Sequence, residues 1–109
     1  MPLVRVYATQ IHDWDSFHDV FSAVFGFPDF YGRNMDAWID CMTCLDDVDA
    51  AMTSIHGSTS DMVVLQIDEV DRMPAEIYKV LVDCAAFVNW SRIEQGDPAI
   101  LAMSCNRTP

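Results

Sequence analysis

Asp36 and Asp40 are the residues whose type and spacing most directly permit chemistry. They are four residues apart in a stretch with helical periodicity, so both carboxylates are expected on one side of a helix. Such a pair can act as an acid and a base, bind a metal ion, or present a charged recognition surface. Two like charges at this spacing destabilise a helix by about 0.2–0.5 kcal/mol. Because the fold gains nothing obvious from Asp40, its carboxylate is a candidate for function.

Catalysis and metal binding fit these two aspartates less well than recognition does. Catalytic carboxylates generally need an apolar pocket or a specific partner that pushes their pKa values apart. The two aspartates instead share the open side of one helix, where Mg²⁺ or Ca²⁺ would lack further fixed oxygen ligands. No Ser/His/Asp set, glycine-rich phosphate loop or His-x-x-x-His spacing occurs elsewhere in the sequence. We therefore predict that the protein is not an enzyme and that it holds no cofactor or metal.

Two other clusters invite a metal or redox interpretation. The acidic run Asp46–Asp49 lacks the Gly and the Glu that an EF-hand loop requires, so we expect solvated carboxylates there. Cys41 and Cys44 form a C-x-x-C pair, but inside an expected helix and without a second pair at zinc-binding spacing. The four cysteines are therefore predicted to be free thiols.

The segment Phe27–Met42 is expected to position the two aspartates. Pro28 fixes its own backbone angle and Gly32 can adopt a positive φ, so the segment should begin as a rigid loop. Asn34 is suited to cap a helix that begins at the next residue, because its side-chain oxygen can accept a free backbone N–H. The apolar face of this helix consists of Met35, Trp38, Ile39 and Met42.

The remaining elements are predicted from periodicity and from residues that start or stop helices. The predicted strands are Leu3–Ala8, Met62–Ile67 and Ala99–Ser104, and the predicted helices run from Ser16 through Val24, from Met35 to about Leu45 and from Pro74 to about Trp90, with a short helix allowed around Val48–Ile55. Ser16 and Asp19 have the spacing of a capping box, and Gly26 should end the first helix. His18 points away from the apolar stripe and is expected to be solvated. Helices between short apolar strands, in the order β-α-α-β-α-β, predict an α/β fold with a small parallel sheet.

Length and charge limit the classes of function. A chain of 109 residues predicts one domain over 1–109, and 51% hydrophobic residues predict a folded core. Seventeen acidic residues against six basic ones give a net charge of −11. This charge argues against nucleic acid or a membrane as partner and favours a positively charged partner, although acidity can also serve solubility alone. Without a leader or an apolar run of membrane length, we expect a cytoplasmic monomer.

The stretch Phe30–Cys41 reads F-Y-G-R-N-M-D-A-W-I-D-C: an aromatic pair, then Gly-x-Asn-x-Asp, then a short hydrophobic step to Asp-Cys. This pattern resembles that of the barstar family, the intracellular protein inhibitors of bacterial ribonucleases. The resemblance implies a three-stranded parallel sheet covered by helices and a protein that inhibits rather than catalyses. It also implies a basic, extracellular-type ribonuclease as the partner, whose phosphate sites the aspartates would occupy.

The resemblance also implies roles for individual residues. It assigns Asp40 to the central phosphate site and Asp36 to flanking arginine or lysine contacts, with Phe30 at the edge of the cleft. The other residues expected at the partner surface are Asn34, Met35, Ile39, Thr43 and Cys44. Structural roles compete for some motif residues, since Asn34 can be only a cap, Gly32 only a turn, and Tyr31 and Trp38 only core.

Departures from the family pattern leave the target open. Ile39 stands where an aromatic residue is usual, and Cys44-Leu45 stands where a Gly-aromatic pair is usual. The acidic residue expected from the last helix has no secure counterpart among Ser91, Glu94 and Gln95. Two alternatives therefore remain, an immunity protein against a different basic toxin and an acidic regulator of an unrelated basic partner.

Overall fold

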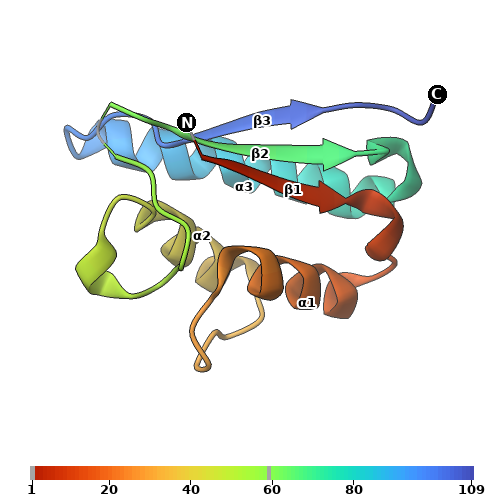
Figure 1. The fold of residues 1–109 in the computed structure, drawn as a ribbon, viewed down its shortest axis with the longest axis horizontal. Helices are drawn as coiled ribbons and strands as arrows, with labels where there is room; N and C mark the ends of the chain where they lie inside the picture. The colour runs from red at the N-terminus through yellow and green to blue at the C-terminus, as the bar shows by residue number, and fades with distance from the viewer. Residues whose placement is uncertain (1, 59) are drawn as a thin grey trace.

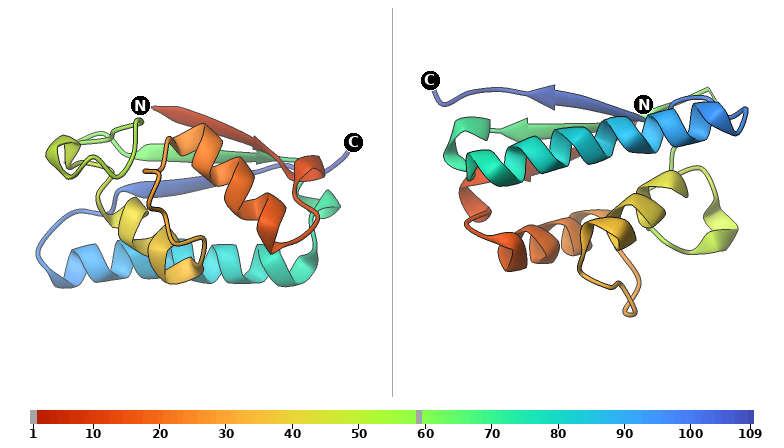
Figure 2. Two further views of the ribbon diagram at one scale, coloured as in Figure 1. Left: turned by 90° about the horizontal axis from the view of Figure 1, so that it is seen from below. Right: turned by 180° about the vertical axis from the view of Figure 1, so that it is seen from behind.

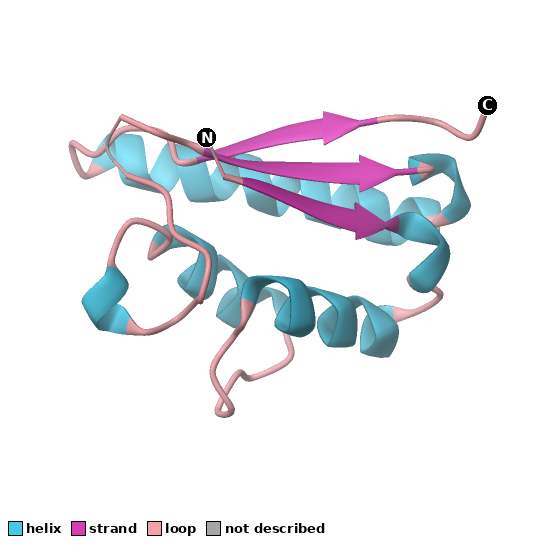
Figure 3. Ribbon diagram, in the orientation of Figure 1, coloured by secondary structure: helices cyan, strands magenta, loops and turns pink. Residues whose placement is uncertain are grey.

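Three short parallel strands form the sheet on which the other elements are built (Figures 1 and 3). The computed structural model describes residues 2–58 and 60–109. The strands are β1 (Leu3–Tyr7), β2 (Val63–Asp68) and β3 (Leu101–Cys105), and β2 lies between the other two. Leu3 pairs with Val64, and Val63 pairs with Leu101. The predicted α/β class, the three parallel strands and the element order are confirmed.

All three α-helices lie on one side of this sheet (Figure 2). Along β1, Val4 and Val6 are buried while Leu3, Arg5 and Tyr7 are exposed, and β2 alternates between buried and half-buried residues. Successive side chains of a strand point to opposite faces, so one face carries the core and the other meets solvent. The second strand was predicted from its nearly continuous apolar sequence, and its outward-facing residues are half-buried. A continuous apolar sequence is typical of double burial, but helices cover only one face here.

The first helix, α1, spans Trp14–Phe25 and has a defined boundary at each end. The Asp13 carboxylate accepts the Ser16 backbone N–H at 2.8 Å, and the Ser16 hydroxyl oxygen accepts the Asp13 N–H at 3.1 Å. The capping box therefore uses Asp13 and Ser16, and the predicted pair of Ser16 and Asp19 is wrong. Ser16, at the third helical position, accepts the backbone N–H of the N-cap residue, a contact that Glu makes in the usual motif. Gly26 ends the helix with a φ of +68°, as predicted.

The other two helices are α2 (Met35–Thr43) and α3 (Ala75–Glu94). Short 3₁₀ turns lie at Ala8–Gln10, Val48–Ala50 and Val70–Arg72. The helix allowed around Val48–Ile55 is therefore only one turn. Val48 is 62% exposed and contributes little to the core, and Ala51 adopts a left-handed φ of +55°, which stops the helix.

Aromatic residues fill the core between the sheet and the helices. Phe17, Phe21 and Trp38 are fully buried, and the Phe21 and Trp38 ring centroids are 5.8 Å apart. Burying each such side chain stabilises the fold by about 1.5–3 kcal/mol. The contact between Phe21 of α1 and Trp38 of α2 fixes which side of α2 faces inward. Trp38 therefore belongs to the core rather than to the surface.

Candidate partner-binding site

The α2 helix presents its two aspartates to solvent. Its N-cap is Asn34, whose side-chain oxygen accepts the Ala37 N–H at 2.8 Å, as predicted. Because Trp38 and its neighbours on the same side are buried, Asp36 and Asp40 lie on the opposite side, and both are exposed. The helix thus holds two carboxylates about one turn apart on a rigid element.

No basic side chain neutralises these two aspartates within the described part of the chain. The ion pairs there join Arg5 to Asp68, Arg33 to Asp15 and Asp19, and Arg92 to Asp46. Neither Asp36 nor Asp40 takes part in one. Their negative potential therefore remains available to a partner.

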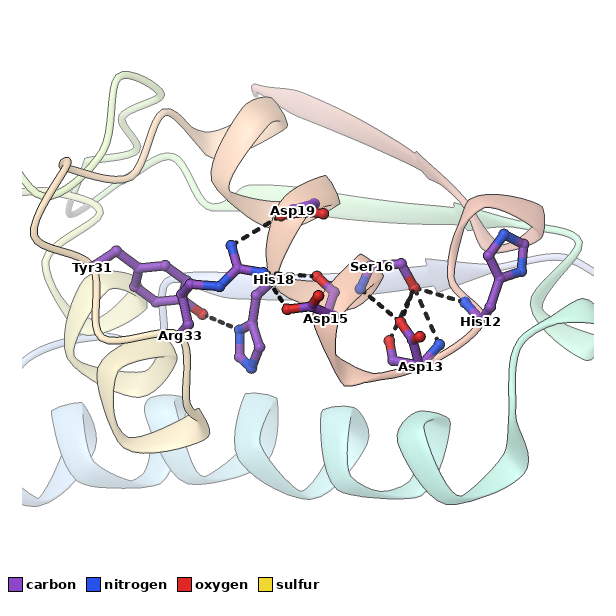
Figure 4. A network of polar contacts seen from close by, with 8 residues as sticks. All are labelled: His12, Asp13, Asp15, Ser16, His18, Asp19, Tyr31 and Arg33. Atoms are coloured by element: carbon purple, nitrogen blue, oxygen red, sulfur yellow. Dashed lines mark hydrogen bonds and ion pairs between the residues drawn. The ribbon is translucent and has the colours of Figure 1, made fainter.

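The loop before α2 is held in a defined shape. The Tyr31 N–H donates to the Pro28 carbonyl oxygen at 2.9 Å, which closes a turn, and Phe30 on that turn is 76% exposed. The Tyr31 hydroxyl is hydrogen-bonded to His18 Nδ1 at 2.6 Å (Figure 4). His18 is only 5% exposed, so its predicted solvation is wrong. The prediction failed because it considered only the periodicity of α1, whereas Tyr31, which contacts the histidine, lies in the loop after that helix.

Burial also sets the protonation of this hydrogen-bonded pair. Desolvation, with a further contribution from the positive charge of Arg33, lowers the pKa of His18. Desolvation likewise raises the pKa of Tyr31. A neutral imidazole therefore meets a neutral phenol, and the bond is kept without a buried charge.

Arg33 ties the same loop to α1. Its Nη2 donates to the Asp15 carboxylate at 2.8 Å and to the Asp15 carbonyl oxygen at 3.1 Å, and its Nη1 lies 2.9 Å from the Asp19 carboxylate (Figure 4). Arg33 has a φ of +54°, whereas Gly32 does not have the positive φ that the sequence suggested for it. The left-handed residue is thus the arginine, and its two carboxylate contacts offset the steric cost of that conformation.

A buried arginine supports the other end of α2. Arg92 of α3 is 5% exposed and donates to the carbonyl oxygens of Thr43 and Pro98, each at 2.9 Å. Its two terminal nitrogens bind both carboxylate oxygens of Asp46 at 2.9 Å. The hydrogen bonds from Arg92 lower the pKa of Asp46. The prediction of a solvated Asp46 is therefore wrong, because the sequence does not show that a cation 46 positions later reaches it.

The remaining predicted surface residues surround the α2 aspartates. Phe30 and Asp40 line an open hollow of about 160 Å³, whose other lining residues are Tyr31, Gly32, Ala37, Cys41 and Met52. Met35, Ile39, Thr43 and Cys44 are half-buried, and Asn34 is exposed. The Thr43 hydroxyl donates to the Asp40 carbonyl oxygen at 2.9 Å, within the helix. Of the three candidates on the last helix, Ser91 is half-buried and Glu94 and Gln95 are exposed, so the choice among them stays open.

Burial raises the pKa of three of the cysteine thiols, Cys41, Cys84 and Cys105. All four cysteines are free. Burial, together with the charges of Cys44 and Asp40, raises the pKa of the Cys41 thiol to about 11. Among residues 2–58 and 60–109, no group of three His, Cys, Asp or Glu side chains is arranged to hold a metal ion. No described helix is both long enough and apolar enough to cross a membrane.

Comparison with known proteins gives the family. The sequence model of the family described as "Barstar (barnase inhibitor)" matches residues 1–99. The chain belongs to the barstar family. A protein of Bacillus subtilis (strain 168) named "Putative ribonuclease inhibitor YrdF" is 30% identical over 74 residues, which cover 61% of this chain and 81% of that protein. The resemblance carried by Phe30–Cys41 therefore extends over most of the sequence of this barstar-family protein.

The sequence did not identify the α1 residues that hold the loop. Asp15 and Asp19 have the same four-residue spacing that drew attention to Asp36 and Asp40. Arg33 is the only Lys or Arg between Arg5 and Arg72. An isolated cation in an acidic chain, with two acids one turn apart nearby, was the available signal for this contact.

Proposed function

We propose that this barstar-family protein inhibits a small, basic bacterial ribonuclease by covering its active site with the Phe30 loop and the exposed side of α2. The main support is that Asp36 and Asp40 are exposed and form no ion pair among the described residues, whereas Arg33 and Arg92 bind other aspartates. Family membership and the name of the Bacillus subtilis relative support the same target class.

The mechanism follows from what a ribonuclease must bind. Its active site holds RNA phosphates with cationic side chains, and a carboxylate can accept two parallel hydrogen bonds from one arginine. Asp40 would take the central phosphate position, and Asp36 would meet flanking cations. Phe30, already 76% exposed, would pack at the edge of the cleft. Since α2 is capped and packed before binding, little ordering entropy is lost when the partner arrives.

The charge of the whole molecule assists the encounter. A net charge of −11 attracts a basic enzyme over a range of about 8–10 Å near physiological ionic strength. Association should therefore be fast at low salt and slow steeply as salt rises, whereas dissociation depends on short-range contacts. Stopped-flow kinetics across a salt series measures both rates. An association rate that does not change with salt would remove electrostatic steering from the mechanism.

An RNA-cleavage assay tests the proposed function directly. A panel of small basic bacterial ribonucleases that includes barnase is titrated with the protein, and stoichiometric inhibition of at least one enzyme is expected. The Asp36→Asn/Asp40→Asn variant should lose inhibition. The Glu76→Gln/Asp97→Asn variant should retain it, because it removes two exposed acids outside α2, one in the first turn of α3 and one three residues beyond its end.

Each outcome of this assay has a separate meaning. If saturating protein leaves cleavage unchanged across the panel, the ribonuclease target is wrong. If both double variants lose inhibition equally, net charge rather than the α2 surface accounts for binding. The protein alone is expected to leave RNA intact in the same assay, and cleavage by the protein alone would contradict the inhibitor role.

A further inference from the structure

Arg33 is a positive charge in the middle of the segment that the proposed function directs at a basic enzyme. It lies between the exposed Phe30 and the N-cap Asn34, and its side chain is 41% exposed. An unrestrained arginine at this position would repel a cationic active site. The same residue has a left-handed backbone, which is unfavourable for a residue with a Cβ atom. Both properties require compensation from elsewhere in the molecule.

The compensation comes from one side of α1. Asp15 and Asp19 lie one turn apart. The Asp15 carboxylate is 2.8 Å from one terminal nitrogen of the Arg33 guanidinium, and the Asp19 carboxylate is 2.9 Å from the other. Two carboxylates around one guanidinium leave a net negative cluster where a lone cation would otherwise be. The hydrogen bond between His18 and Tyr31, from the same helix to the same loop, provides a second attachment at 2.6 Å. Figure 4 shows these contacts side by side along α1.

We propose that Asp15 and Asp19 are positioning residues for partner binding: they hold Arg33 against α1, which preforms the Phe30 loop and removes the arginine's charge from the partner-facing surface. This role rests on the proposed function, because it concerns the same partner and the same surface. It adds α1, which contributes none of the residues predicted to contact the partner. The ion pairs thereby serve affinity through the shape and charge of the loop.

The first test uses the free protein and needs no partner. In the Asp15→Asn/Asp19→Asn variant, trypsin should cleave after Arg33 about three- to tenfold faster, as expected from losing two exposed ion pairs. Amide exchange of Tyr31, whose N–H donates to the Pro28 carbonyl, should accelerate by a similar factor. The Glu76→Gln/Asp97→Asn variant has the same net charge and should match the wild type. Unchanged cleavage and exchange would overturn the positioning role.

The second test is a double-mutant cycle with a ribonuclease that the wild type inhibits. Asp15→Asn/Asp19→Asn should weaken binding about tenfold more than the charge-matched control, mainly through faster dissociation. Arg33→Gly removes the cation and accepts the left-handed backbone without strain. In the Arg33→Gly background, the two Asn substitutions should cost no more than the control does. Equal losses in both backgrounds would show that the two acids act only as general charge and would overturn the inference.

The two proposals fail in different ways. If no ribonuclease in the panel is inhibited by the wild type, the proposed function fails, while proteolysis and exchange still decide whether α1 holds the loop. If the wild type inhibits an enzyme and the cycle is additive, the function stands and the role of Asp15 and Asp19 is wrong.

Discussion

Two pairs of aspartates in this protein have the same spacing and opposite surroundings. The α1 pair, Asp15 and Asp19, and the α2 pair, Asp36 and Asp40, each begin in the first turn of a helix and continue one turn later. The α1 pair is bound by Arg33, whereas no ion pair of the described residues includes the α2 pair. The same local pattern is therefore held in ion pairs in one helix and stays exposed to solvent in the other. Only a cation from a distant segment distinguishes them.

The largest expected effect on binding comes from removing Asp40, the second member of the α2 pair. Asp40→Ala should weaken ribonuclease binding by about 3–5 kcal/mol, because the enzyme's buried cations would lose their anion. The free energy of unfolding should stay the same or rise by about 0.2–0.5 kcal/mol, since one like-charge repulsion is relieved. A binding titration beside a urea melt measures both quantities. If Asp40→Ala unfolds easily while its folded fraction binds normally, Asp40 is a structural residue and the contrast between the two pairs disappears.

The next largest effect concerns a third carboxylate, Asp46, whose cation is buried. Arg92→Met should lower the free energy of unfolding by about 2–4 kcal/mol, because Asp46 and two carbonyl oxygens lose their donors at once. Lys79→Met, at an exposed position on the same helix, should change it by less than about 0.5 kcal/mol. Urea melts at neutral pH compare the two variants. An equal response would mean that pairing does not decide which acids stabilise this fold.

The pH dependence of stability reports on the His18 contact beside the α1 pair. Burial, and then Arg33, lowers the pKa of His18 below its usual 6.5, so the unfolded chain takes up a proton more readily than the native protein. The contribution of His18 should be fully present above about pH 6.5 and decline as the pH falls toward its lowered native pKa.

A substitution isolates this contribution. His18→Phe should lower the free energy of unfolding at pH 7.5 by about 1 kcal/mol, through loss of the bond to Tyr31, and should flatten the decline below pH 6.5. His12→Gln, at an exposed histidine, should keep the wild-type pH dependence. Urea melts from pH 5 to 8 measure both slopes. Parallel curves for wild type and His18→Phe would assign the decline to other groups.

The smallest effect compares the first members of the two pairs. Asp36→Ala gives up a favourable interaction with the helix N-terminus but relieves repulsion from Asp40, so the free energy of unfolding should fall by no more than about 0.5 kcal/mol. Asp15→Ala loses the same kind of helix interaction together with an ion pair to Arg33, and should lower it by about 1 kcal/mol. Thermal melts at low and high salt measure the difference. An effect of Asp36→Ala larger than that of Asp15→Ala would reverse the comparison.

Features that depend on neighbouring residues were predictable from the sequence. The Asn34 cap, the stop at Gly26 and the outward side of α2 each follow from residue types within one or two turns. The parallel three-stranded sheet followed from the order of elements and from the family resemblance. Whether Asp36 and Asp40 bind a partner stays a prediction.

Features that depend on contacts between distant segments were not predictable in the same way. His18 was expected to be solvated because the periodicity of α1 does not show Tyr31 above it. The positive φ was assigned to Gly32 because its type permits it, whereas ion pairs to α1 make Arg33 the left-handed residue. Val64 continues an apolar run and yet is only half-buried, because no helix covers its face of the sheet. In each case the deciding group comes from another element of the fold.

The position of Arg92 in the chain sets the time at which α2 gains its full support during synthesis. The donor to the Thr43 carbonyl oxygen lies 49 residues further on, so a ribosome that adds about 5–20 residues per second makes α2 roughly 2–10 seconds before that donor exists. In this interval α2 is a nine-residue helix with a capped start and an unanchored end, which is marginal in isolation. The segment Phe30–Cys44 therefore gains the contact with Arg92 only when α3 has been made and has docked. Under the proposed function, we expect a nascent chain to inhibit only when its synthesis is almost finished.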